Sequence, residues 1–209
     1  MVDTYIKISG QFRPAVMSLA TFDDVTRLGA WLEEYKDYTD SRTGDILEYV
    51  VDSVTKLGKY AERGRCAADE TSFLAKARLG SEEEEEVAGL FVLKCAALNG
   101  EIVGFIFLRR LWDRSLVMDY LARCPYENLR LESAGYVAGG LLLGACLLAQ
   151  QLKAPYLWWE TTEASHSLYV GMLTKADIKV GASRPKSNLF ISKTAYLRFI
   201  GYVKGLPKS

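Results

Sequence analysis

The sequence has little of what several classes of enzyme and binding protein require. It contains a single histidine, His166, among 209 residues. Hydrolases with a serine or cysteine nucleophile use a histidine as the base, so this class is excluded unless His166 has that role. We interpret His166 as a surface or partly buried side chain. Excess charge is also absent, because 26 Lys and Arg residues balance 26 Asp and Glu residues. Without a basic field for a polyanion, nucleic-acid binding is not expected.

Cysteines and long apolar segments are scarce as well. The four cysteines are far apart in the sequence, which predicts neither a disulfide framework nor a metal site. The longest apolar run, Tyr136–Ala149, is shorter than the roughly 20 residues that cross a bilayer. The N-terminal residues lack the pattern of a signal peptide. We therefore expect a cytoplasmic protein with no membrane span and no bound metal.

The length and composition fit a single α/β domain over residues 1–209. Apolar spacing predicts strands over Thr4–Ile8, Ala15–Leu19, Val87–Leu98, Glu101–Leu111, Ser115–Arg123 and Tyr156–Glu160, and a last hairpin from Asp177–Gly181 and Leu189–Ser192. It predicts helices that begin after Thr21 and that cover Thr43–Tyr60, Asp69–Leu79, Val137–Gln151 and Glu163–Leu173, with Thr194–Val203 as a helix or an extended tail.

Two short segments give local predictions. Asn99-Gly100 predicts a two-residue hairpin turn, because both residues tolerate a positive φ. Glu82–Glu86 is a block of five carboxylates. Such a density of like charge favours a solvated loop or helix end over a metal site.

The stretch from Leu116 to Tyr169 predicts a strand, a helix with small residues at its start, a second strand and a further helix. The N-terminus of a helix has free N–H groups and a positive dipole end, so it can bind an anion. Small residues such as Gly139 and Gly140 would let a phosphate reach the backbone. They could equally let the helix pack closely on the sheet, and the residues alone leave both readings open.

This stretch resembles the cofactor-binding core of the GNAT superfamily, the acyl-CoA-dependent N-acyltransferases. In that family a strand leads into a turn of the form Gly-x-Gly/Ala-x-x-Leu-Leu, and a later helix carries Leu-Tyr. Here the turn reads Tyr136-Val137-Ala138-Gly139-Gly140-Leu141-Leu142, and Ala149 and Leu168-Tyr169 stand at the expected spacings. Tyr136 takes the place of the usual first glycine.

The resemblance implies a GNAT-like α/β (α+β) fold. Its central sheet would be mixed, mostly antiparallel and split in a V shape, with helices on both sides. Residues 1–13 would add an N-terminal strand, and residues 116–173 would form the acyl-CoA-binding core. The cosubstrate would be acetyl-CoA, and no metal would take part. The backbone amides expected to hold it are those of Leu121, Ala122, Arg123, Tyr136, Val137, Ala138, Gly139 and Gly140.

The resemblance also implies direct attack of an amine on the thioester. Tyr169 matches the family's general acid, and the carboxylates of Asp119 and Glu160, on or at the end of the two flanking strands, are candidates for the base. The expected acceptor is a primary amine of a small molecule or a protein. The alternative is a GNAT-like module that has lost catalysis and serves in binding or oligomerisation.

Two further expectations concern other parts of the chain. The long helical region within residues 27–64 suggests a lid or a homodimer contact. The basic cluster of Arg109, Arg110 and Arg114 beside Trp112 would either contact the 3′-phosphate of CoA or lie on a solvated rim.

Overall fold

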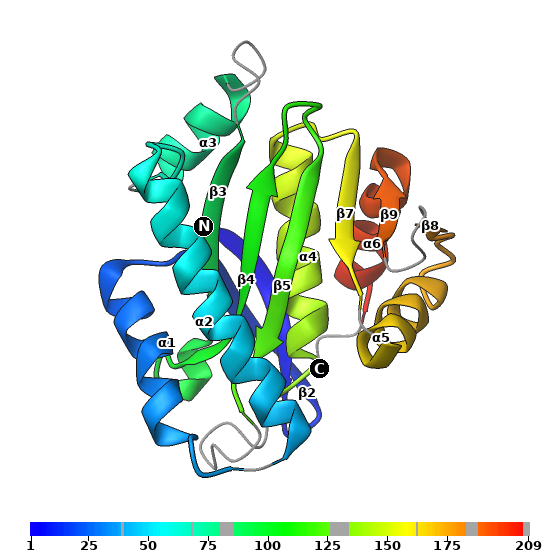
Figure 1. The fold of residues 1–209 in the computed structure, drawn as a ribbon. Coiled ribbons are helices and arrows are strands. Elements are labelled where there is room, and N and C mark those ends of the chain that lie inside the picture. Colours follow the sequence, from blue (N-terminus) through cyan, green and yellow to red (C-terminus); the bar gives the residue numbers. More distant parts are fainter. Residues whose placement is uncertain are drawn as a thin grey trace.

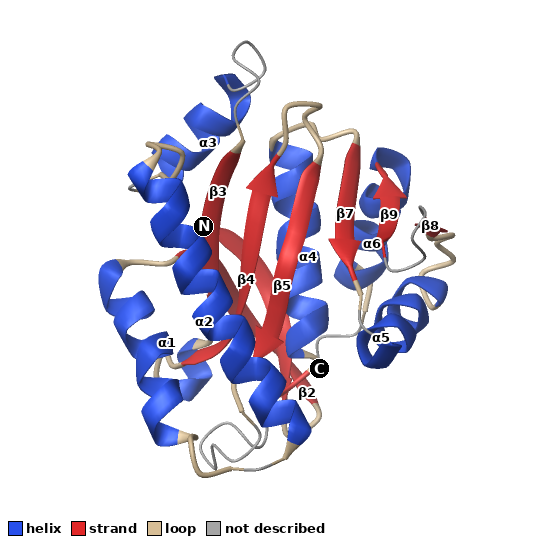
Figure 2. Cartoon of the chain, in the orientation of Figure 1, coloured by secondary structure: helices blue, strands red, loops and turns tan. Residues whose placement is uncertain are grey.

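The computed structural model describes residues 1–38, 40–67, 69–79, 86–125, 134–161, 163–182 and 188–206. Its strands form one sheet in the order β6-β1-β2-β3-β4-β5-β7-β9-β8 (Figures 1 and 2). The strands are β1 (Val2–Ile8), β2 (Gln11–Leu19), β3 (Val87–Lys94), β4 (Ile102–Arg110), β5 (Leu116–Arg123), β6 (Ala134–Gly135), β7 (Tyr156–Glu160), β8 (Gly181–Ala182) and β9 (Asn188–Ser192). The helices are α1 (Phe22–Glu34), α2 (Ser41–Glu62), α3 (Glu70–Leu79), α4 (Val137–Gln151), α5 (Glu163–Thr174) and α6 (Lys193–Lys204).

Helices cover both faces of the sheet, so the prediction of a helix-flanked α/β fold is confirmed. α1, α2 and α3 lie over one face, and α4 lies over the other with α6 packed beside it (Figure 1). α1 begins with a capping box, in which the Thr21 side chain accepts from the Asp24 amide and Asp24 accepts from the Thr21 amide. α2 begins after Asp40, which accepts from the amides of Arg42 and Thr43.

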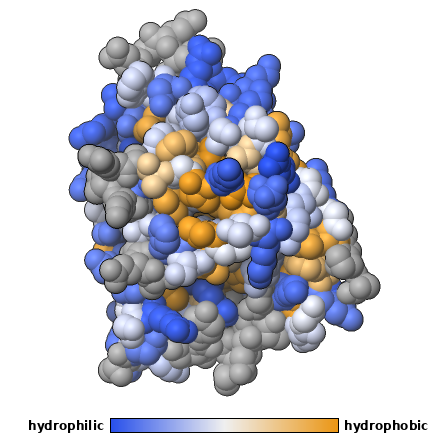
Figure 3. Space-filling model, turned by 90° about the vertical axis from the view of Figure 1, so that its right-hand side faces the viewer, coloured by the Kyte–Doolittle hydropathy of each residue, from blue (hydrophilic) through white to orange (hydrophobic). Residues whose placement is uncertain are grey.

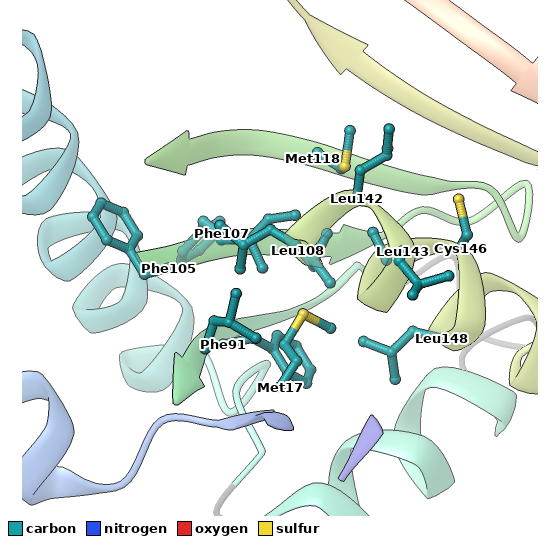
Figure 4. Packing of buried hydrophobic residues seen from close by; sticks show 14 of the residues in the cluster. Met17, Phe91, Phe105, Phe107, Leu108, Met118, Leu142, Leu143, Cys146 and Leu148 are labelled. Atoms are coloured by element: carbon teal, nitrogen blue, oxygen red, sulfur yellow. The ribbon is translucent and has the colours of Figure 1, made fainter. Parts of the chain in front are cut away.

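The core between the sheet and α4 explains the apolar run in the sequence. Leu142, Leu143 and Cys146 of α4 are fully buried and lie among Leu108 and Met118 of the sheet (Figure 4). Phe105 points to the opposite face, where its ring lies 6.2 Å from that of Trp31 in α1. The sheet therefore has apolar side chains on both faces, which is why both must be covered.

The sheet splits between β5 and β7. Neighbouring strands in the sheet are antiparallel except for this parallel pair, in which only Leu116–Leu157, Val117–Trp158 and Met118–Trp159 are in register. β5 continues to Arg123 while remaining paired with β4. The side of β5 that faces β7 thus has no strand partner from Asp119 onward, and this is the V-shaped split that was expected.

Three boundaries differ from the predictions. β2 begins earlier than predicted and includes Pro14, which pairs with Tyr5 of β1. The pairing of β2 with β3 covers only Val16–Leu19. Pro14 therefore has no strand on its other side, and its missing N–H costs no hydrogen bond of the sheet. The predicted two-residue turn at Asn99-Gly100 is wrong: both residues have a positive φ, 55° and 73°, but β3 ends at Lys94 and β4 begins at Ile102, with a 3-10 turn, Ala96–Leu98, between them. β6 was not predicted, because its two residues become a strand only by pairing with Lys7 and Ile8 of β1.

The last hairpin is shorter than predicted, since β8 covers only Gly181–Ala182. The C-terminal alternative is decided in favour of a helix, α6. Seen from the side of β8 and α5, the surface has apolar side chains in its middle and hydrophilic ones around them (Figure 3). Within the part of the chain that the structure describes, no helix is both long enough and apolar enough to cross a membrane.

Candidate active site

The split between β5 and β7 contains a cavity of about 240 Å³. It brings together Asp119, Glu160 and Tyr169, the three side chains that the sequence selected as candidates for acid and base. The residues that line it are Tyr49, Asp119, Tyr120, Leu121, Glu160, Thr161, Ser165 and Tyr169. A second cavity, of about 400 Å³, is lined by Arg109, Leu111, Asp113, Val117, Asp119, Trp158, Trp159, Glu160 and Asn188. The two cavities therefore share Asp119 and Glu160.

Asp119 is placed by an irregularity in β5. Met118 pairs with Leu108 and Tyr120 with Phe107, so Asp119 is an extra residue in the ladder with β4. Such a bulge turns the side chains of neighbouring residues to the same face. Lys56 of α2 contacts both Asp119 and Tyr120. Its Nζ lies 3.1 Å from the Asp119 carboxylate and 4.7 Å from the centre of the Tyr120 ring.

The Asp119 carboxylate forms ion pairs with Arg109 and Lys56. Arg109 of β4 donates to it twice, from Nε at 2.6 Å and from Nη2 at 2.8 Å, and Lys56 adds a third donor. Burial alone would lower the pKa of Arg109, but the hydrogen bonds and charge of Asp119 raise it above its ordinary value. These three donors come from two different elements, β4 and α2, and hold the carboxylate in one orientation. Asp119 thus organises the wall of the site.

Glu86 extends this network. It accepts from Nη1 of Arg109 at 3.1 Å and from the hydroxyl of Tyr60. The expectation of a solvated carboxylate block is therefore wrong at Glu86, whose charge is neutralised by Arg109. The rest of the block, residues 82–85, lies outside the described residues.

Glu160 differs from Asp119 although both line the same two cavities. It ends β7, beyond the last pair with β5, and its side chain is exposed. Among the described residues, its carboxylate makes no hydrogen bond or ion pair. Its lone pairs are consequently available to a proton or to a ligand in either cavity.

Tyr169 lies in α5 with its ring buried against Trp159, the two ring centres being 5.6 Å apart. Burial, and to a smaller extent the neighbouring Tyr49, raises the pKa of Tyr169 above its ordinary value. The phenol therefore stays protonated at neutral pH and can donate. Its neighbour Leu168 points outward and is 49% exposed. His166 is half-buried and lines neither cavity.

The start of α4 differs from a glycine cradle. Tyr136 adopts the left-handed conformation, with φ at 57°, and its side chain does not cap the helix. A Cβ on Gly139 would meet the ring of Tyr136 at 2.4 Å, and one on Gly140 would meet the carbonyl oxygen of Tyr5 at 2.7 Å. The Gly140 carbonyl also accepts from the buried hydroxyl of Thr4. Both glycines therefore allow close packing at the start of α4.

The remaining amides expected to hold the cosubstrate fall into two places. Val137 and Ala138 form the first turn of α4, where helical N–H groups have no partner four residues earlier. Leu121 lines the smaller cavity, while Ala122 is buried and Arg123 ends β5. Gly104 pairs with Arg123 and lies against Val137, so the end of β5 and the start of α4 are neighbours.

The basic cluster does not lie near the start of α4. Arg109 is committed to Asp119, and Arg110 is buried with its Nε directed at the carbonyl of Ala77. Burial lowers the pKa of Arg110 to about 10. Both precede β5, whereas α4 approaches its far end, on the order of 25 Å away for a strand of this length. The expectation of a solvated rim is therefore wrong for Arg109 and Arg110, and neither side chain lies at the start of α4.

Sequence reasoning missed the contribution of α2. Tyr49, Lys56 and Tyr60 all reach the site or its wall. These three residues recur at helical spacing on one side of α2. Such a stripe of polar groups on an amphipathic helix is the sequence pattern that could have indicated their place at the site. Among the residues with described positions, no group of three or more His, Cys, Asp and Glu could hold a metal ion.

Comparison with solved structures identifies the class of fold. FdhC, a nucleotide-linked sugar GNAT, aligns over 99% of this chain and 99% of its own, with a TM-score of 0.55 and 12% identity. Weaker likenesses, with TM-scores of 0.48 and 0.45, are to a GNAT-family acetyltransferase from Listeria monocytogenes 4b F2365 and to PaiA N-acetyltransferase from Thermoplasma acidophilum, solved with coenzyme A. The former is 10% identical over 90% of this chain and 99% of that chain, and the latter 13% identical over 85% and 98%.

The chain therefore has the fold of the GNAT acetyltransferases, as the resemblance in sequence implied. No protein-family model matches the sequence. No curated protein matches it either.

Proposed function

We propose that this protein is an N-acetyltransferase that moves the acetyl group of acetyl-CoA to a primary amine. The observation that carries the proposal is the pair of cavities that meet at Asp119 and Glu160 inside the split of a GNAT fold. One cavity would hold the thioester end of the cosubstrate and the other the acceptor. Such a junction brings two substrates together without either blocking the other.

The residues present fit acetyl-CoA. The side of β5 from Asp119 to Arg123 has no strand partner toward β7, so an extended chain carrying amides can add to it. The first turn of α4, at Val137 and Ala138, offers N–H groups and a positive dipole end to phosphate. Acetyl-CoA, when bound, supplies an activated acyl group whose carbonyl carbon accepts a nucleophile.

The side chains of the split have separate roles in this reaction. The acceptor nitrogen forms a bond to the carbonyl carbon, and the carbon–sulfur bond breaks. Glu160 takes the proton that the amine loses, directly or through one water. Tyr169, kept protonated by burial, donates a hydrogen bond to the departing thiolate, which takes its own proton from solvent after release. Asp119 positions Lys56 and Arg109 along the wall and takes no proton.

Release of free thiol from acetyl-CoA by the purified protein, measured with a panel of amines, tests the proposal. Turnover that falls by about 10²-fold in Tyr169→Phe, while calorimetric binding of acetyl-CoA persists, is the expected result. Leu168→Ala, one residue away and facing solvent, is the matched control and should retain activity. Absence of both binding and turnover would refute the proposal.

A non-catalytic binding module is the second candidate. It is favoured by Tyr136, whose ring covers Gly139 at the start of α4. Binding of coenzyme A without turnover of any amine would support this reading. For both candidates we propose a cytoplasmic location, because the four cysteines are unpaired, as expected in a reducing compartment.

A further inference from the structure

A third cavity, of about 210 Å³, lies beside the start of α4. It is lined by the rings of Phe12, Tyr136 and Tyr202, by the side chains of Lys7 and Lys175, and by two apolar side chains. None of its lining residues lines either cavity of the split. We call it the aromatic pocket.

Pairing of distant strands fixes two of the rings. Lys7 of β1 pairs with Phe12 of β2 on one side and with Gly135 on the other, which brings Phe12 close to Tyr136. Their ring centres lie 5.6 Å apart and the ring planes are inclined by 88°. The positive φ of Tyr136 persists in such a residue only where the surroundings enforce it. The half-buried rings therefore offer fixed, flat surfaces against which another ring can stack.

The charge of the aromatic pocket is positive. Among the lining residues that the structure describes, only Lys7 and Lys175 are charged at neutral pH. The Nζ of Lys7 lies 4.8 Å from the centre of the Phe12 ring, and neither lysine forms an ion pair with a described residue. Asp177, the acidic residue nearest to Lys175 along the chain, pairs with Arg198 instead. Two ammonium groups are therefore left for an anion.

Backbone groups and phenols near the aromatic pocket do not cancel this charge. α4 begins here with the positive end of its dipole. α5 and α6 end here, but carbonyls of their last turns accept from the amides that follow, including those of Ala176 and Gly205. Burial, and to a smaller extent Tyr202, raises the pKa of Tyr136, so this phenol stays neutral.

We infer that the aromatic pocket binds a planar aromatic group that carries negative charge, such as a purine nucleotide. The ring stacks against Phe12 or Tyr136, and the anion meets Lys7 and Lys175. The volume of about 210 Å³ is below the roughly 300–1,000 Å³ of sites that enclose a drug-sized ligand. It suits one ring system, with the anionic group at the mouth where Lys175 is exposed. The inference does not rest on the proposed acetyl transfer.

Two sources offer this chemistry, a free nucleotide and the nucleotide end of the cosubstrate. Met172 of α5 lines the aromatic pocket and follows Tyr169 of the smaller cavity by three residues, roughly 4.5 Å along the helix. Val137 and Ala138, whose amides we propose for phosphate, directly follow Tyr136. A molecule bound in the split can thus extend to the aromatic pocket, and the experiment must separate the two sources.

The first test compares adenosine monophosphate with its two fragments, adenosine and ribose 5-phosphate, by calorimetric titration of the purified protein. Adenosine monophosphate should bind at least about 10-fold more tightly than either fragment, because one fragment lacks the anion and the other the ring. Equal affinity for adenosine monophosphate and adenosine would show that the lysines recognise nothing. Equal affinity for adenosine monophosphate and ribose 5-phosphate would show the same for the rings. Either result would overturn the inference.

Variants of the two lysines locate the binding site. Lys7→Met and Lys175→Met should each raise the Kd for adenosine monophosphate by roughly 5-fold and leave that for adenosine unchanged. Phe12→Leu should weaken both ligands. Lys59→Met removes an equal charge from an exposed position on α2, over the other face of the sheet, and is the matched control. Lysine variants that behave like Lys59→Met would place the nucleotide elsewhere and contradict the assignment.

Titration of adenosine monophosphate in the presence of saturating acetyl-CoA separates the sources. Unchanged binding assigns the aromatic pocket to a free nucleotide. Displacement assigns it to the cosubstrate, provided that Lys175→Met weakens acetyl-CoA and not acetyl-pantetheine. Both results support the site. Acetyl transfer without binding of adenosine monophosphate would overturn this inference alone, and binding without transfer to any amine would refute the proposed function alone.

Discussion

Arg109 and Asp119 are joined by two hydrogen bonds across neighbouring strands, from Nε to Oδ2 at 2.6 Å and from Nη2 to Oδ1 at 2.8 Å. This fork fixes the Asp119 carboxylate and, with Lys56, compensates its charge. Glu160 faces the same two cavities without such partners among the described residues. Asp119 therefore supports the wall of the site, whereas Glu160 is the carboxylate that we propose as the proton acceptor.

Glu160→Gln and Asp119→Asn should separate these roles. Glu160→Gln is expected to lower kcat by about 10²-fold with little change in stability, because it removes a proton acceptor that holds nothing in place. Asp119→Asn should mainly lower stability, since it leaves Arg109 and Lys56 without their carboxylate. Amine acetylation and urea unfolding of both variants give the comparison. A larger loss of kcat in Asp119→Asn, after correction for the folded fraction, would reverse the assignment.

Arg109→Met should lower the free energy of unfolding by about 2–4 kcal/mol, because it leaves Asp119 largely buried with Lys56 as its main partner. Urea denaturation at neutral pH measures the loss. Lys36→Met is the control, since the Lys36–Glu33 pair is exposed on α1 and the adjoining turn and should contribute less than about 1 kcal/mol. Equal losses in the two variants would show that the Arg109 fork adds nothing specific.

Alkaline pH should reveal the burial of Tyr169. Its folded pKa is raised by burial above the value of about 10 in an unfolded chain. The stabilising contribution is therefore complete below about pH 10 and is lost as the pH rises further, because the unfolded state ionises first. Tyr169→Phe should reduce the drop in the urea midpoint between about pH 8 and about pH 11. A drop as large as that of the unchanged protein would mean that Tyr169 is not buried in solution.

Gly140→Ala tests close packing at the start of α4. The new Cβ would lie 2.7 Å from the carbonyl oxygen of Tyr5, a backbone atom that cannot turn away. We expect a loss of roughly 1–3 kcal/mol in the free energy of unfolding. Gly58→Ala, in α2 with no atom near the new Cβ, should instead add up to about 1 kcal/mol through helix propensity. Thermal or urea unfolding of the two variants checks both signs.

Local chemistry explains which elements were predictable. The predicted Val137–Gln151 and Tyr156–Glu160 coincide with α4 and β7. The apolar run that ends before Pro155 and the short aromatic segment that follows it can be recognised from the sequence without knowledge of any distant partner. The two residues of β6 could not be predicted, because their strand conformation depends on pairing with β1 at the other end of the chain.

The sequence by itself determined the order along the chain of the strands and helices other than β6, the capping of α1 and the place of Tyr169 after β7, because these follow from apolar spacing and from neighbours along the chain. It could not show that ion pairs hold Asp119 but not Glu160, or that the glycines of α4 pack against other parts of the chain. Only the tertiary structure decided those points, since Lys56 reaches Asp119 across 63 positions and Gly140 meets the carbonyl of Tyr5 from a distant strand. Charge compensation and close packing depend on distances in space, and local sequence patterns do not contain them.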